Sequence, residues 1–119
     1  MTFIFDLDGT LSAAPHVFGN LMVSLIKGGH KVVVLTGAIQ GIEITLEQRL
    51  QQLAGYDLYE DIHFNDLVIA VGRDIKEVAT EKGNYCKAVG ADMVFEDNED
   101  YIRFIKAVSP STTCLLMRP

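Results

Sequence analysis

The chain has 119 residues, of which 49% are hydrophobic and 22% charged, and its formal net charge is −6. This composition excludes a disordered chain, and the negative charge makes nucleic acid and anionic membrane surfaces unfavourable partners. The length predicts a single domain over residues 1–119. Two cysteines without a paired metal spacing, no export signal and no apolar run of ~20 residues predict a cytoplasmic protein.

Strand and helix signals alternate along the first half of the chain. A short buried strand is expected at 2–5, "TFIF", followed by an amphipathic helix at 15–27 that begins with a proline and ends before two glycines. The run "KVVVLT" at 31–36 is continuously apolar, which is typical of a strand covered on both faces. Apolar residues at every third or fourth position predict a second helix from about 42 to 55.

The second half continues this alternation after an irregular connection at 56–66. Buried strands are expected at 67–71, 92–95 and 112–117. Asp74 can cap a turn that leads into a helix ending near Val89, and Asn98 can cap a helix that Pro110 ends.

Strands that alternate with helices indicate right-handed βαβ units. We therefore predict an α/β fold of three layers, a Rossmann-like parallel five-stranded sheet with helices on both faces and no cap domain. In such sheets ligands bind beyond the carboxyl ends of the strands. The residues at those ends are the candidates for a functional site.

Acidic residues follow several of these strands. Asp6 and Asp8 come after the first strand, Asp74 after the third, and an acidic run that includes Asp97 after the fourth. On one edge of a parallel sheet these carboxylates would repel one another unless a cation lay among them. A few carboxylates completed by waters are typical of Mg²⁺, which we predict as the cofactor.

Four segments resemble the motifs of a known group. They are "FDLDGTL", "VVVLTG", a lysine within 82–87 and "VFEDNED". In order and spacing they are similar to the motifs of the haloacid-dehalogenase-like (HAD) hydrolase superfamily, and the absence of a cap indicates its small capless phosphatase type. The resemblance covers residues 2 to about 105.

The resemblance implies roles for the first motif. Asp6 would attack phosphorus and form an aspartyl-phosphate, and Asp8 would protonate the leaving oxygen. In an extended chain residues i and i+2 point the same way, so both carboxylates can reach one phosphate while Leu7 packs elsewhere. Gly9 would let the backbone approach the phosphate, and Thr10 would support the site by hydrogen bonding.

The second and third motifs would bind the phosphate. The Thr36 hydroxyl and the Gly37 amide are expected to hold a phosphoryl oxygen, and Lys82 to offset negative charge on the nucleophile and the phosphoryl group. Lys87 remains the alternative to Lys82. Ala38 stands where many relatives have arginine, so one frequent substrate contact is absent.

The fourth motif would complete the metal site. The resemblance implies that Asp6, the Asp8 backbone carbonyl and Asp97 bind Mg²⁺. The frequent second aspartate of this motif falls on Tyr101. The roles of the other acidic residues of the run stay open; these are Glu96, Glu99 and Asp100.

The predicted function is a Mg²⁺-dependent phosphomonoester hydrolase that acts through an aspartyl-phosphate on a small metabolite or nucleotide phosphate. Without a cap the site is open, so neighbouring subunits of a homo-oligomer are one way to cover it. The alternatives are a non-catalytic binding or regulatory protein of the same fold, and a phosphatase for a nucleic-acid end or a protein phosphate. A phosphoacceptor domain of receiver type is disfavoured, because its acceptor aspartate would follow the third strand.

Overall fold

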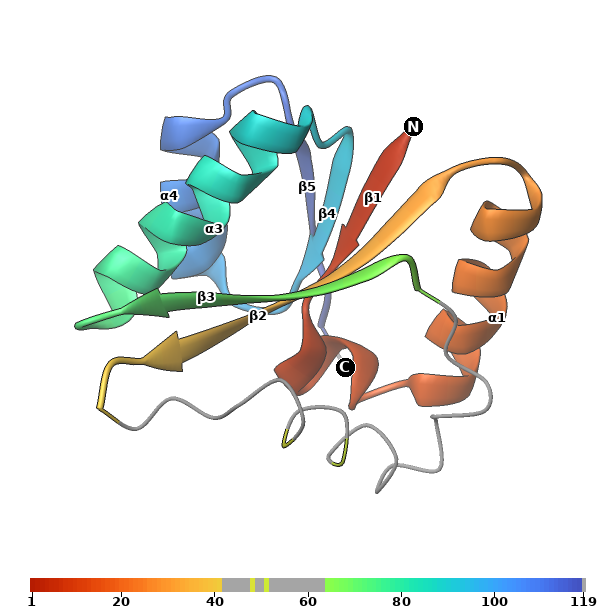
Figure 1. Ribbon diagram of the computed structural model, residues 1–119, viewed down its shortest axis with the longest axis horizontal. Coiled ribbons are helices and arrows are strands. Elements are labelled where there is room, and N and C mark those ends of the chain that lie inside the picture. The colour runs from red at the N-terminus through yellow and green to blue at the C-terminus, as the bar shows by residue number, and fades with distance from the viewer. Residues whose placement is uncertain (42–47, 49–50, 52–63, 119) are drawn as a thin grey trace.

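The computed structural model describes residues 1–41, 48, 51 and 64–118. In this part of the chain five strands form one parallel sheet in the order β3-β2-β1-β4-β5 (Figure 1). The strands are β1 (Thr2–Phe5), β2 (Lys31–Ile39), β3 (Asp66–Gly72), β4 (Met93–Glu96) and β5 (Thr113–Leu116). The chain adds β2 and β3 on one side of β1 and then returns to add β4 and β5 on the other.

Helices cover both faces of this sheet (Figure 1). Helix α1 (Pro15–Lys27) lies on one face, and α3 (Ile75–Val89) and α4 (Glu99–Val108) lie together on the other. A short irregular turn, η1 (Leu7–Leu11), connects β1 to α1. The predicted three-layer Rossmann-like fold is confirmed, with no cap domain among the described residues. None of the described helices has the length and apolar character to span a membrane.

The continuously apolar strands are explained by two cores, one on each face of the sheet. Under α1 the Phe5 and Phe95 rings stack with centroids 4.6 Å apart, and the edge of Phe18 meets both. On the opposite face Ile4 and Val94 pack under α3 and α4. Because neighbouring residues of a strand point to opposite faces, a strand buried on both sides is apolar throughout.

Helices α3 and α4 pack closely because Gly83 of α3 has no side chain. A Cβ atom at Gly83 would lie 2.8 Å from the Val108 Cβ, so a larger residue would separate the two helices. Each helix begins at the predicted cap. Asp74 accepts a hydrogen bond from the Glu77 backbone N–H at 2.8 Å, and Asn98 accepts those of the first turn of α4.

The element boundaries differ from the predicted ones at a few points. Strand β2 continues three residues beyond Thr36, to Ile39, because β3 pairs with it as far as Gly72. The turn expected at 75–79 is the first part of α3, which begins directly after Asp74. The helix expected at 42–55 lies almost entirely outside the described residues.

Candidate functional site

A small pocket lies at the carboxyl ends of β1 and β4, the two strands between which the strand order reverses. Ligand sites of doubly wound sheets form at this position, because the connections from neighbouring strands diverge there. The pocket has a volume of about 220 Å³. We call it the acidic pocket; its lining residues are Asp6, Asp8, Gly37, Lys82, Glu96, Asp97, Asn98 and Tyr101.

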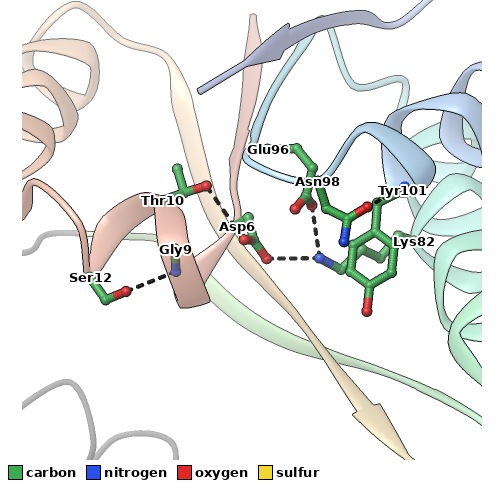
Figure 2. A network of polar contacts seen from close by, with 8 residues as sticks. All are labelled: Asp6, Gly9, Thr10, Ser12, Lys82, Glu96, Asn98 and Tyr101. Atoms are coloured by element: carbon green, nitrogen blue, oxygen red, sulfur yellow. Dashed lines mark hydrogen bonds and ion pairs between the residues drawn. The ribbon is translucent and has the colours of Figure 1, made fainter. Parts of the chain in front are cut away.

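An ion-paired triad lies at the acidic pocket and consists of Asp6, Lys82 and Glu96 (Figure 2). The Lys82 Nζ donates to Asp6 Oδ1 at 2.8 Å and to Glu96 Oε2 at 3.0 Å. The Lys82 and Glu96 side chains are each 1% exposed, so the ammonium and the carboxylate are both removed from water. Charges that are buried in this way persist only when they are paired and hydrogen-bonded. The triad therefore holds α3 to the ends of β1 and β4.

The two buried carboxylates of the triad, Asp6 and Glu96, have raised pKa values, chiefly because they are buried. Burial raises the pKa of Glu96 to about 8, with Lys82 opposing the shift and Asp6 adding to it. Burial also raises the pKa of Asp6, again against the effect of Lys82 and with that of Asp97. Burial alone would lower the pKa of Lys82, but the charges of Asp6 and Glu96 raise it above its ordinary value. The site thus disfavours full ionisation of its acids.

Three of these acids lie close enough together to hold a cation. One carboxylate oxygen from each of Asp6, Glu96 and Asp97 lies within 4.8 Å of the other two. The Glu96 Oε1 atom is buried and has no hydrogen-bond partner among the described residues. An orphaned buried carboxylate oxygen is costly, and a hard divalent cation would satisfy it. The donor set, oxygen atoms alone, fits Mg²⁺.

The turn after β1 directs the first pair of acids into the acidic pocket. Asp6 and Asp8 both line it, whereas Leu7 between them is fully buried in the core under α1. This matches the expected i, i+2 arrangement. Asp8, however, is exposed and lies outside the group of three carboxylates. Thr10 is buried and donates a long hydrogen bond, 3.4 Å, to Asp6 Oδ2.

Gly9 allows the turn to pass close to Asp97. Its φ is +81°, and a Cβ atom there would lie 2.1 Å from Asp97 Oδ2. Both the left-handed backbone and the close approach disfavour a side chain at this position. The glycine of the first motif thus keeps the Asp97 carboxylate among the other acids.

We expect Gly9→Ala to lower the free energy of unfolding by about 2 kcal/mol, since it adds left-handed strain and a contact with Asp97. Gly29→Ala is the matched control. Gly29 has a φ of +84° but no atom within 4 Å of its Cβ position, so only the strain of about 1 kcal/mol applies. Urea denaturation measures both, and equal losses in the two variants would rule out the contact with Asp97.

The second predicted motif lies within β2, before the last residues of the strand, and is beside the triad. The Thr36 hydroxyl is fully buried and has no hydrogen-bond partner among the described residues. Gly37 lines the acidic pocket, and a Cβ atom there would meet Val78 of α3 at 2.5 Å. The absence of a side chain at Gly37 therefore lets α3 place Lys82 beside this part of β2.

The structure places the remaining candidates. Lys82 lies in the acidic pocket, whereas Lys87 is exposed on the same helix. Glu99 and Asp100 are exposed and pair with Arg118 and Arg103. Sequence reasoning left Glu96 unassigned, although its position at the end of a buried strand is the signal that could have identified it.

Comparisons with known proteins identify the fold. No family model and no curated protein matches the chain. Among solved structures, the chain is similar to a protein from the universal stress protein family of Burkholderia pseudomallei. The TM-score is 0.57 and the identity 10%, over 98% of this chain and 94% of the other. At this identity the likeness establishes the fold and not what the chain binds.

These findings overturn the family predicted from the motifs. The structural match is to a universal stress protein, and no comparison supports a HAD hydrolase. The assignment as a Mg²⁺-dependent phosphatase with an aspartyl-phosphate intermediate was therefore wrong, and the hydrolase assignment is withdrawn with it. The physical reason is that the matching residues stand at strand ends, where doubly wound sheets of different families gather polar side chains. Short motifs at such positions follow the fold and do not identify the chemistry.

Proposed function

We propose that this chain is a binding protein for Mg²⁺ and, through the metal, for a small phosphorylated ligand. The observation that carries the proposal is the convergence of the Asp6, Glu96 and Asp97 carboxylates, together with the Glu96 Oε1 atom, which has no hydrogen-bond partner among the described residues. These three carboxylates would hold the cation. The bound metal would supply a positive charge that attracts phosphate oxygens.

The charge of the acidic pocket sets the order of binding. Four carboxylates line it, those of Asp6, Asp8, Glu96 and Asp97, against the one ammonium of Lys82. A phosphate would be repelled from this surface until a divalent cation reduces its negative charge. Binding of the phosphorylated ligand should therefore depend on Mg²⁺. Gly37, which lines the acidic pocket from β2, would lie on the phosphate side.

We expect Asp97→Asn to weaken Mg²⁺ binding at least about 10-fold, because a charged ligand is replaced by a neutral one. Isothermal titration calorimetry with Mg²⁺ alone measures the effect. The matched control is Asp100→Asn, three residues away and exposed, where the affinity should change by less than about twofold. A wild-type protein that binds no Mg²⁺, or an Asp97→Asn variant that binds it equally well, would refute the proposal.

We also propose that the protein is cytoplasmic. Cys86 and Cys114 are free thiols, and Cys86 is completely buried in the core under α3 and α4. Burial raises the pKa of the Cys86 thiol to about 12, so it stays protonated and unreactive. Free cysteines that serve as core residues are typical of reducing compartments.

A further inference from the structure

We propose that the Tyr101 hydroxyl is a hydrogen-bond donor to the terminal phosphate of the ligand and that this residue selects for a phosphomonoester. The inference rests on the proposed function, since it concerns the same acidic pocket. It assigns a role to a residue that stands where the predicted motif would have had an aspartate.

Tyr101 is placed at the pocket by the start of α4. Asn98 caps this helix and accepts the backbone N–H of Tyr101 at 3.2 Å. The ring then lies beside Lys82, with the Nζ atom 4.7 Å from its centroid (Figure 2). The hydroxyl points to β2 at Gly37, and it is 3.9 Å from the position that a Cβ of Gly37 would occupy. Tyr101 therefore forms the wall between the triad and β2.

The phenol is available to a ligand. Tyr101 is one of the residues that line the acidic pocket, and its side chain is half-buried. Burial raises the pKa of Tyr101, with Lys82 opposing this and the carboxylates adding to it, so the group stays protonated at neutral pH. A protonated phenol is a donor that can reach a phosphate oxygen.

Lys82 cannot fill this role unaided. Its side chain is 1% exposed, and two of its three N–H donors are used by Asp6 and Glu96. The face of the Tyr101 ring lies over the ammonium and stabilises it there. A phosphate oxygen that enters the acidic pocket would thus contact the Tyr101 hydroxyl. The Lys82 ammonium would lie on the face of the Tyr101 ring.

The size of the pocket defines the class of ligand. Its volume of about 220 Å³ is below the ~300–1,000 Å³ of sites that enclose a whole drug-sized molecule. It can enclose a metal-bound phosphate group while the rest of the molecule stays outside. A terminal phosphate, as in a phosphomonoester, fits this volume, whereas a phosphate esterified on two sides would need room for a second substituent.

The test uses inorganic phosphate as the probe and protein saturated with Mg²⁺. We expect Tyr101→Phe to weaken phosphate binding by about 10-fold or more, the loss typical of one hydrogen bond to a charged group. Tyr85→Phe is the matched control, since Tyr85 packs against the core under α3 and is not part of the acidic pocket. The tyrosine difference spectrum on adding phosphate should be present in wild type and in Tyr85→Phe and absent in Tyr101→Phe.

The outcomes separate this inference from the proposed function. If wild type binds Mg²⁺ and phosphate and only Tyr101→Phe loses phosphate affinity and the difference spectrum, the inference is supported. Equal phosphate affinity in all three proteins would overturn the role of Tyr101 and leave the metal site standing. Wild type that binds Mg²⁺ but no phosphate would overturn both this inference and the phosphate part of the proposal. Wild type that binds no Mg²⁺ would overturn the proposed function itself, and the inference with it.

Discussion

Replacing Lys82 by methionine is expected to lower the free energy of unfolding by about 4 kcal/mol at pH 8 in metal-free buffer. The change keeps much of the side-chain volume but removes the ammonium, which leaves Asp6 and Glu96 buried without a counter-charge. Removing one partner of a buried ion pair typically costs about 3–5 kcal/mol. The loss should be smaller at pH 5, where protonation can neutralise the carboxylates. Urea denaturation at the two pH values measures it.

Lys87→Met is the matched control, because Lys87 lies on the same helix but is exposed. It should change stability by no more than about 0.5 kcal/mol. Saturating Mg²⁺ should restore more stability to Lys82→Met than it adds to wild type, since the cation would replace the missing positive charge. If Lys82→Met were as stable as Lys87→Met at pH 8, the triad would not be the electrostatic support described above.

Glu96→Gln is expected to remove a large part of the pH dependence of stability. Burial raises the pKa of Glu96 from 4.5 to about 8, so between these values the folded protein holds a proton that the unfolded chain has released. Unfolding then releases a proton and becomes easier as pH rises. The stability contribution of this group is fully present below pH 4.5 and is lost as the pH passes through about 8. At about 1.4 kcal/mol per pKa unit the loss is at most about 5 kcal/mol.

Urea denaturation at pH 5 and pH 8.5, with a chelator present, measures this effect. The glutamine can still accept a hydrogen bond from Lys82 but cannot ionise, so the variant should lose at least about 2 kcal/mol less than wild type between the two pH values. Glu99→Gln is the control, because Glu99 is exposed and pairs with Arg118 at the surface. Parallel pH profiles for wild type and Glu96→Gln would show that Glu96 titrates normally in the folded protein.

The sequence predicted the site residues after β1 better than it predicted Glu96 at the end of β4. Asp6 and Gly9 stand directly after a buried strand, and parallel strands share one carboxyl edge, so their place at the site followed from the pattern. The role of Glu96 could not be predicted from the pattern in the same way. Its pairing with Lys82 depends on where β4 ends relative to β1 and on how closely α3 approaches the sheet at Gly37.

The family assignment failed for a related reason. "FDLDGTL" describes a strand, a turn and two acids, and this combination arises in any doubly wound sheet that collects carboxylates at its central strand. The motif therefore located the site without identifying the reaction. The contacts of each carboxylate are known only from the assembled site. The contacts in that site are the basis for proposing a binding role.

Local sequence patterns were sufficient to predict the alternation of strands and helices, the parallel sheet and the edge on which polar side chains gather. These features follow from local periodicity and from the right-handed connection between parallel strands. The contact between Asp6 and Lys82, which are 76 residues apart, emerged only from the assembled fold. The same is true of the pairing of Glu96 with Lys82 and of the position of the Tyr101 ring over the lysine. The reason is that contacts between distant segments depend on helix packing and strand register, which no local pattern encodes.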